Sequence, residues 1–432
     1  MSTSPSSPES PAAAALVGLP VLRPWLENFY RHLHAHPELS HHEVATSETV
    51  AANLGDDGYE VHEGLGGTGV IGVLRNGPGP TVLVRADMDA LPVAEATGLA
   101  YASQVVVTDD EGNAVPVMHA CGHDVHVTCL LGAARLLAQS RDHWSGTLVT
   151  LFQPAEETGD GARGMVESGL VGVIGSIDVA MAQHVLALPA GTVATRVGPV
   201  LAAADSLRIT VYGRGAHGSM PQVSVDPVVL AAMIVVRLQT VVSRETRPGE
   251  PVVVTVGSVH AGTKSNVIAD RAVLELNIRT YTEESRAATL AAITRIVDAE
   301  CAASGAVAPA TFELFDRFPL TENDETVTDR VAAAFAEHFG ARADTLAMQS
   351  ASEDFSDLPN ALGVPYAYWG IGGVDPARYD EARAAGRLTS DIPVNHSPYF
   401  APVIQPTLDT GTEALVVAVL AWLGHEGAGA PQ

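Results

Sequence analysis

Side chains that could bind a metal ion gather between Met118 and His126, where the chain reads MHACGHDVH. Cys121 and His123 stand two positions apart, and Gly122 between them permits a tight turn that would let both reach one metal centre. A buried structural cysteine followed by helix-capping polar groups would produce the same pattern. The segment alone leaves metal binding and a structural role open at about even odds, because Cys-x-His is a weak motif by itself.

Two adjacent carboxylates, Glu156 and Glu157, follow the apolar run from Thr147 to Phe152. Residues that carry out chemistry in α/β proteins gather at the carboxyl ends of the strands. One glutamate could bind a metal while its neighbour accepts a proton from a water held there. A lone Glu-Glu pair is more often an ordinary acidic loop or helix start, so this pair needs partners elsewhere in the chain.

Two histidines occupy comparable positions at the ends of apolar runs. His184 lies at the end of IDVAMAQHV, and His396 lies in VNHSPYF. An isolated histidine is more often a satisfied structural residue than a metal ligand. Five potential ligands at strand ends are harder to explain that way together, although sequence positions do not show that they converge.

Three other patterns are rejected as functional sites. Gly64, Gly66 and Gly69 fit G-x-G-x-x-G, yet the following VIGVL predicts a strand where a phosphate-binding site needs a helix. No G-x-S-x-G element is present and Ser219 lacks that context, so a serine hydrolase is poorly supported. A histidine-rich patch resembles a metal-binding tract, but it fits a helix end followed by a turn better. The histidines of this patch are His32, His34, His36, His41 and His42.

The hydrophobic pattern predicts the elements that would position these residues. TVLVRADMD is an apolar run that ends in acids, as expected of a buried strand that delivers side chains to its carboxyl edge. Asp124 could cap the helix that follows the CGHD segment. Strands that alternate with helices favour a mostly parallel α/β sheet. The predicted helices are 22–36, 43–56, 124–139, 161–168 and 407–424, and the predicted strands are 68–75, 80–87, 146–152 and 177–184.

The pattern changes between about 195 and 312. Strands and helices there follow the β-α-β-β-α-β order of a ferredoxin-like sandwich. The recognisable strands are 205–213, 251–260 and 271–281, and the helices are 226–243 and 283–301. We therefore expect an α/β fold. A mostly parallel-sheet catalytic domain of 21–194 and 313–432 would hold an inserted ferredoxin-like α+β domain of 195–312, after a disordered tail of 1–20.

Composition excludes several other classes of protein. Lys and Arg number 24 against 50 Asp and Glu in 432 residues, so the net charge of −26 would repel nucleic acid and anionic membranes. No uninterrupted apolar run reaches the roughly 18 residues that a membrane-spanning helix needs. Three cysteines cannot form a disulfide framework in so long a chain, which favours reduced thiols and a cytoplasmic protein. The N-terminal stretch lacks a basic n-region, which argues against a signal peptide.

Seven stretches of the chain, taken together, closely resemble the amidohydrolase branch of the aminoacylase and carboxypeptidase-like metallopeptidases. That branch includes hippurate hydrolases, N-acyl-amino-acid hydrolases and indole-acetyl-amino-acid hydrolases. The stretches are HAHPELSHHE, RADMDALPVAE, MHACGHDVH, LFQPAEETGDGARGM, GRGAHGSMPQ, SNVIAD and NHSP. They follow the family's order along most of the chain, and the combination is far more specific than any one motif.

That resemblance implies a dinuclear metal site with five protein ligands. Cys121 matches the ligand that bridges the two ions. Glu156 matches the general base, and Asp87 matches a carboxylate that lies beside the site. The five implied ligands are Cys121, His123, Glu157, His184 and His396.

The inserted domain resembles the family's dimerisation lid, so the resemblance also implies a homodimer through that domain. His217 matches a histidine that reaches a neighbouring active site. Asn266 and Arg279 match lid positions that help to hold substrate. The implied partner besides a second copy is a small N-acyl amino acid or peptide-like substrate, with no nucleic acid and no membrane.

The implied reaction is hydrolysis of the amide bond of N-acyl amino acids or related conjugates, by a metal-activated water with Glu156 as general base. The cofactors would be two divalent ions. A thiolate ligand suits zinc, whereas carboxylate and imidazole also admit manganese or cobalt. A dipeptidase or carboxypeptidase could use the same site. A non-catalytic metal- or ligand-binding dimer is the alternative of another class, and the Glu156–Glu157 pair argues against it because binding alone needs no base.

Overall fold

The computed structural model describes residues 10–108 and 112–424, and this part of the chain forms two compact units. The larger unit runs up to Val200 and continues over Asn323–Ala347 and from Asp354 onward. The smaller unit comprises Leu201–Glu322 and Met348–Glu353. Each unit has its own hydrophobic core.

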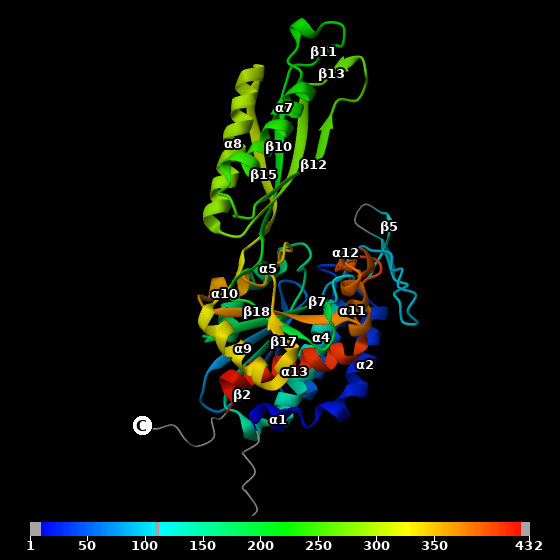
Figure 1. Cartoon of the computed structure of the whole chain (residues 1–432), viewed down its shortest axis with the longest axis vertical. Coiled ribbons are helices and arrows are strands. Elements are labelled where there is room, and N and C mark those ends of the chain that lie inside the picture. Colours follow the sequence, from blue (N-terminus) through cyan, green and yellow to red (C-terminus); the bar gives the residue numbers. More distant parts are fainter. Residues whose placement is uncertain (1–9, 109–111, 425–432) are drawn as a thin grey trace, which may run out of the picture. The chain divides into compact units, whose positions relative to one another are not determined.

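The larger unit is built on an eight-stranded sheet, whose four central strands β6, β3, β7 and β18 are parallel (Figure 1). Every residue of β18 is buried, as expected of a central strand that is covered on both faces. This confirms the predicted α/β fold with a mostly parallel sheet. In spatial order the strands are β1 (Glu60–Leu65), β2 (Gly69–Asn76), β6 (Gly146–Gln153), β3 (Thr81–Asp87), β7 (Val179–Pro189), β18 (Tyr366–Val374), β8 (Val193–Thr195) and β17 (Ala343–Thr345).

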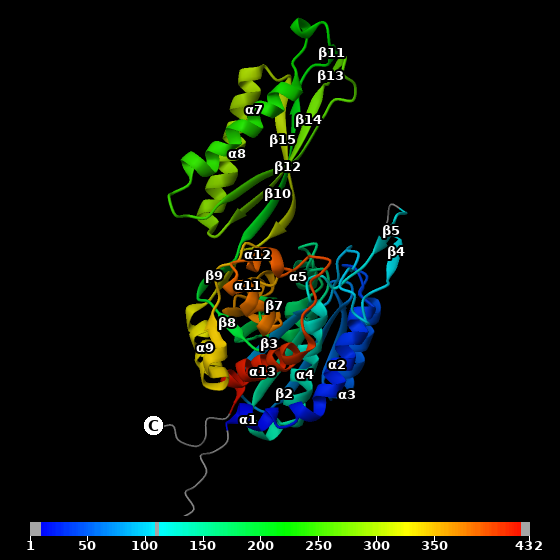
Figure 2. The ribbon, with the colours of Figure 1, turned by 45° about the vertical axis from the view of Figure 1, so that its right-hand side comes forward.

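Helix α4 (His123–Gln139) lies at the centre of the layer that covers this sheet. It packs against α2 (Leu19–Ala35), α13 (Ile404–Leu423) and strand β3, and nearly all of its residues are buried. Figure 2 shows α2, α4 and α13 side by side along the sheet. Further helices of this unit are α1 (Pro11–Leu16), α3 (Val44–Asp56), α5 (Gly161–Glu167), α6 (Leu170–Ile174), α9 (Glu325–Phe339), α10 (Asp357–Leu362), α11 (Pro376–Ala384) and α12 (Leu388–Asp391).

Strand register brings three side chains to one level at the carboxyl edge of the sheet. Asp87, the last residue of β3, pairs with Gln153, the last residue of β6. On the other side β3 pairs with β7 up to Arg85 opposite Ala182, so two further steps place Asp87 level with His184. The side chains of Asp87, Gln153 and His184, from β3, β6 and β7, are therefore level with one another in the sheet.

The smaller unit is a four-stranded antiparallel sheet with α7 (Pro227–Thr240) and α8 (Glu283–Ser304) packed on one face (Figure 2). In order the strands are β12 (Val253–Ala261), β14 (Arg271–Thr280), β10 (Ala203–Tyr212) and β15 (Ala308–Phe318). Chain order 2-3-1-4 is the ferredoxin-like arrangement. A buried ion pair of 2.7 Å between Arg286 and Asp205 joins α8 to β10. Because β15 is an edge strand of this sheet, the unit extends to Glu322, beyond the predicted boundary at 312.

Part of the predicted tail of 1–20 is helical. Residues 1–9 lie outside the described residues, but Pro11–Leu16 form α1, which packs against α13 and α4. Ser10 caps the helix by accepting a hydrogen bond from Ala13 N, and Pro11 suits the first turn. Alanine has the highest helix propensity of the amino acids. The prediction of a disordered tail read this alanine-rich stretch only as a low-complexity sequence.

The predicted cap of α4 is also corrected. The helix begins at His123 with Gly122 as its N-cap in a left-handed conformation. Asp124 lies inside the first turn, where its Oδ1 accepts from Val125 N at 2.9 Å and its Oδ2 contacts His34 Nδ1 at 2.6 Å.

Candidate metal centre

The five side chains of the implied ligand set converge in the larger unit. Cys121 Sγ lies 3.4 Å from His184 Nε2. Glu157 joins the other two histidines, with its Oε1 3.9 Å from His123 Nε2 and its Oε2 3.4 Å from His396 Nε2. Potential ligand atoms of Cys121, His123 and Glu157 all lie within 4.8 Å of one another. The structure thus joins five residues that span most of the sequence.

The turn before α4 aims Cys121 and His123 at the same point because Gly122 lies between them. Its φ of +87° is left-handed, and an added Cβ would approach Val185 Cγ1 to 2.4 Å. An L side chain fits there only if Val185 of β7 moves, and the left-handed backbone would still be strained. On the far side of the centre His396 also has a left-handed φ of +71°, and its N–H donates to Ala120 O at 2.8 Å. This hydrogen bond holds the His396 loop against the turn.

These residues fit a bound cation. His123 Nε2 and Glu157 Oε1 are buried and have no hydrogen-bond partner among the described residues. Burial raises the pKa of the Cys121 thiol well above its usual value, and the neighbouring Glu157, Glu156 and Asp87 carboxylates raise it further. A cation at the centre would satisfy the orphaned atoms and offset the gathered negative charge.

Asp87 lies beside the five ligands and is buried. Its Oδ2 accepts from Arg85 Nη1 at 2.6 Å and lies 3.7 Å from His123 Nε2, while its Oδ1 contacts His126 Nδ1 at 2.5 Å. Burial opposes the charge of this carboxylate, but Arg85, His123 and His126 together hold its pKa well below the usual value. Asp87 therefore remains ionised and places negative charge beside His123.

Asp89 was not among the residues selected from the sequence. The Nδ1 of His123 lies 2.9 Å from the main-chain oxygen of Asp89 and 3.2 Å from its Oδ1. Its Oδ2 accepts from Glu157 N at 3.0 Å and from Ser40 Oγ at 2.7 Å. A carboxylate on the far ring nitrogen is the usual means of orienting a metal-binding histidine. In the sequence, the feature that could have identified Asp89 is its position in RADMD, two residues after Asp87.

His126 was also missed, and its two ring nitrogens are both occupied. Its Nδ1 contacts Asp87, and its Nε2 accepts from Val185 N at 2.8 Å, which assigns the proton to Nδ1. The ring lies 4.4 Å from that of His184. His126 therefore holds β7 next to His184. Its place three residues after His123, on the same helix face, could have indicated this.

The histidine-rich patch does not form a cluster of metal ligands. His34 is buried between two carboxylates, with Asp124 Oδ2 at 2.6 Å from its Nδ1 and Glu95 Oε1 at 3.2 Å from its Nε2. His36 bonds to the main chain of its own helix, and His41 contacts Asp160 at 3.1 Å. His32 and His36 do lie together, with ring centroids 4.5 Å apart, and among the described residues no histidine of the patch belongs to a group of three potential metal ligands.

The three lid residues lie in the smaller unit. His217 is exposed in β11 (Ala216–His217), which pairs with β13 (Val267–Ile268), and Gly218 N donates to Asn266 O at 2.8 Å. His217 and Asn266 are therefore neighbours. Arg279 lies on β14, where it donates to Asn277 Oδ1, Ser350 O and Ser352 Oγ. These contacts anchor Arg279 separately from the β11–β13 pair.

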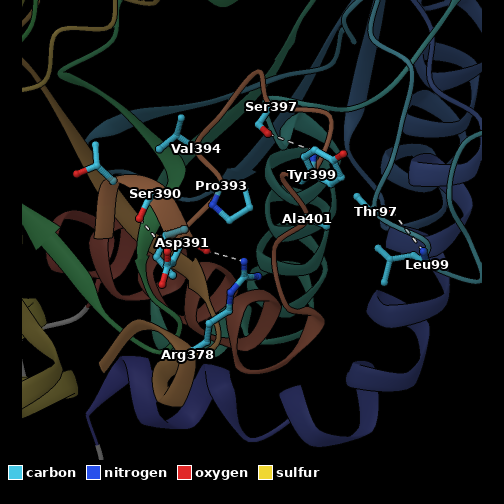
Figure 3. A pocket seen from close by; sticks show the side chains of 12 residues that line it. Thr97, Leu99, Arg378, Ser390, Asp391, Pro393, Val394, Ser397, Tyr399 and Ala401 are labelled. Atoms are coloured by element: carbon cyan, nitrogen blue, oxygen red, sulfur yellow. Dashed lines mark hydrogen bonds between the residues drawn. The ribbon is translucent and has the colours of Figure 1, made fainter. Parts of the chain in front are cut away.

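A pocket of about 650 Å³ lies beside the loop that carries His396 (Figure 3). Val394 and Ser397 line it, whereas Asn395 and His396 between them contact the metal-binding side chains. Arg378 adds a guanidinium at its wall. The volume is within the range of small-molecule sites. The other lining residues are Thr97, Leu99, Thr389, Ser390, Asp391, Ile392, Pro393, Tyr399 and Ala401.

The fold and the cluster of thiol, imidazole and carboxylate groups define a metal-binding hydrolase. Residues 83–384 match the model of peptidase family M20/M25/M40, and the chain belongs to this family. It is 34% identical over 388 residues to N-acetylcysteine deacetylase of Bacillus subtilis, covering 89% of this chain and 97% of that protein. It is 40% identical over 312 residues to thermostable carboxypeptidase 2 of Saccharolobus solfataricus, covering 71% and 76%.

A solved structure gives the same assignment. The YXEP protein of Bacillus subtilis, described as a dinuclear metal-binding peptidase of the M20 family, superposes with a TM-score of 0.75 and 30% identity. The match covers 93% of this chain and 99% of that one. The predicted family and the prediction of a hydrolase are thereby confirmed.

Proposed function

We propose that this chain hydrolyses the amide bond of N-acyl amino acids or related conjugates, with Glu156 as the general base beside two divalent metal ions. The observation that carries the proposal is the position of Glu156. Its Oε2 lies 3.9 Å from His123 Nε2, and its sequence neighbour Glu157 belongs to the ligand cluster. The name of the deacetylase relative also denotes an N-acyl amino acid as substrate.

The five converging residues, Cys121 among them, would hold the ions. Ions bound there would supply Lewis-acid polarisation of the carbonyl and would lower the pKa of water towards about 7. Glu156 accepts the proton of the attacking water and returns it to the leaving nitrogen. Asp89 and His126 act indirectly, by keeping His123 and β7 in place. Zinc suits the thiolate best, and manganese or cobalt would suit the imidazole and carboxylate groups.

Glu156→Gln tests the base directly. The variant should keep two ions per chain, measured by elemental analysis, while kcat falls by about 10²–10⁴-fold because the amide cannot accept a proton. Glu157→Gln is the matched neighbour, and it should lose bound metal together with activity. Full activity in Glu156→Gln would exclude the assignment of the base.

We also infer a homodimer through the smaller unit. Helix α7 buries Leu230 and Ile234 against its own sheet, yet Val229, Met233 and Val236 on its other side are 50–66% exposed. The segment Pro227–Glu245 is even long and apolar enough to cross a membrane by length and composition. Because one face is already packed on a sheet, a second protein copy is the better partner for the exposed stripe. Met233→Asp should shift the mass measured by light scattering from dimer to monomer.

In this dimer His217 would reach the active site of the partner and stabilise the oxyanion, while Asn266 and Arg279 would hold substrate. Loss of such an oxyanion donor typically costs about 10²–10³-fold in rate. Mixing inactive Glu156→Gln with inactive His217→Ala should restore activity if the histidine acts across subunits. Absence of restoration in confirmed heterodimers would contradict the assignment.

A carboxypeptidase activity is the second candidate, because the chain is 40% identical to thermostable carboxypeptidase 2. Free dipeptides and N-acetyl, N-benzoyl and N-blocked peptide substrates distinguish the two activities by their kcat/KM values. A non-catalytic binding dimer would hydrolyse none of these substrates, whichever divalent metal ion is added. We propose a cytoplasmic location, which the small number of cysteines and the absence of a disulfide among Cys121, Cys129 and Cys301 support; cell fractionation tests this.

A further inference from the structure

Glu43 reaches across the larger unit to the loop that carries Glu156. It is fully buried at the N-cap position of α3, yet its side chain makes no capping hydrogen bond to that helix. Instead its Oε1 accepts from Ala155 N at 2.8 Å and from His41 N at 2.9 Å, and its Oε2 accepts from Thr68 Oγ1 at 2.6 Å. Burying a carboxylate costs free energy unless hydrogen bonds replace those it made with water. The three hydrogen bonds of Glu43 supply that replacement.

Ala155 has a backbone conformation that needs outside support. Its φ of +51° is left-handed, which costs a non-glycine residue about 1–2 kcal/mol, and it lies buried immediately before Glu156. The neighbouring main chain is also held closely. Gly161 N donates to Ala155 O at 3.1 Å, and a Cβ on Gly161 would lie 1.8 Å from Pro154 O. The loop cannot relax without moving Glu156.

A second buried carboxylate holds the other side of Glu156. Asp89 Oδ2 accepts from Glu157 N at 3.0 Å. The residues before and after Glu156 therefore each donate their N–H to a buried acid, Ala155 to Glu43 and Glu157 to Asp89. Asp89 also contacts His123, whereas within the described part of the chain no hydrogen bond or ion pair links Glu43 to the five ligands.

We propose that Glu43 is a positioning residue for Glu156: by accepting the Ala155 N–H it maintains the left-handed turn that directs the Glu156 carboxylate at the reacting water. The inference rests on the proposed function of Glu156. Removing the acceptor leaves a buried N–H unpaired on an already strained residue, so the turn relaxes and Glu156 shifts. A displacement of about 1 Å at a reacting group can lower the rate by 10²-fold.

Three variants of the metal-loaded enzyme separate positioning from a general structural role. Glu43→Leu removes the acceptor, and kcat should fall by about 10²-fold with KM within threefold and two ions still bound. Glu43→Gln keeps an oxygen for Ala155 N and an NH₂ that can donate to Thr68, so kcat should return to within threefold of wild type. Thr68→Val removes only the contact on the other carboxylate oxygen and should leave kcat within threefold.

Glycine at position 155 provides an independent rescue, because it adopts the left-handed conformation without strain. Ala155→Gly added to Glu43→Leu should recover at least fivefold of the lost kcat, which a defect in folding alone would not allow. If Glu43→Leu does not fold, Glu43→Asp takes its place, since the shorter side chain cannot reach Ala155 N and keeps its charge.

Two results would overturn the proposal. One is a folded Glu43→Leu or Glu43→Asp enzyme with wild-type kcat. The other is a loss of bound metal in step with kcat, or an equal loss in Glu43→Gln, because either would mean a structural role. Failure of the proposed function is distinguishable, since it shows as full activity in Glu156→Gln and does not involve Glu43.

Discussion

His123 and Asp89 are joined through the ring nitrogen of the histidine that faces away from Glu157. His123 Nδ1 lies 2.9 Å from the main-chain oxygen of Asp89, while its Nε2 lies 3.9 Å from Glu157 Oε1. The same Asp89 accepts the N–H of Glu157. One carboxylate therefore contacts two members of the ligand set from different elements, His123 at the start of α4 and Glu157 after the end of β6.

Asp89→Ala should weaken metal binding by roughly 10-fold. Loss of a residue that hydrogen-bonds a metal-binding histidine typically lowers affinity by about 10–100-fold, so this effect is at the lower end. The effect is moderate because the main-chain oxygen at position 89 still accepts from His123. Competition with a chromophoric chelator measures the affinity. Ser40→Ala is the control, since it removes only the hydrogen bond from Ser40 to Asp89. Unchanged affinity in Asp89→Ala would mean that the carboxylate does not orient His123.

Metal binding should release a proton from Cys121 at pH 7. Burial and the nearby Glu157 and Glu156 raise the pKa of this thiol, so the metal-free protein holds it protonated, whereas a metal binds the thiolate. Calorimetry of zinc binding in buffers of different ionisation enthalpy counts the protons released. Cys121→Ala should release about one proton fewer and bind less metal. Equal proton release and occupancy would remove Cys121 from the ligand set.

Gly122→Ala should lower both metal occupancy and activity. The added Cβ would lie 2.4 Å from Val185 Cγ1 and force Cys121 and His123 apart or move β7. Gly169→Ala is a matched control. It too is a left-handed N-cap glycine, with φ +97°, but no atom lies within 4 Å of its added Cβ. Backbone strain alone should lower the free energy of unfolding of Gly169→Ala by about 1–2 kcal/mol, and this variant should keep its metal. Equal metal loss in both variants would contradict the steric argument.

Stability should fall as the pH rises from about 6.5 towards 10, owing to His34. Burial opposes its charge, but Asp124 and Glu95 overcome this and raise its pKa from 6.5 to about 10. A raised histidine pKa stabilises the fold fully below the unfolded value of 6.5, and that contribution disappears as pH passes through the folded value. Melting temperatures of His34→Gln should be lower at pH 6 and decline less between pH 7 and 10. Parallel curves for the two proteins would refute the assignment.

Much of the site followed from residue types and their place at the ends of apolar runs. CGHD, the Glu156–Glu157 pair, His184 and His396 were all identified as candidates. The expected strand positions hold for Glu156–Glu157, which follow β6, and for His184 in β7, whereas His123 begins α4 and His396 lies in the loop after α12. Three strands and both helices of the ferredoxin-like order were recognised in the smaller unit, but the fourth strand, β15, was not, so the predicted boundary at 312 cuts through it. The N-terminal helix was missed because its alanine-rich sequence resembled a low-complexity tail.

Residue types and their spacing were enough to predict the kinds of ligand, the two adjacent carboxylates and the family. The folded chain was needed to see which nitrogen of each histidine faces the centre, and that His126 and Asp89 support ligands. It also revealed Glu43, which contacts Ala155 across 112 positions of chain. Such contacts depend on backbone conformation and on the burial of unpaired N–H groups. These are properties of packed chain segments, and a linear pattern of residue types does not contain them.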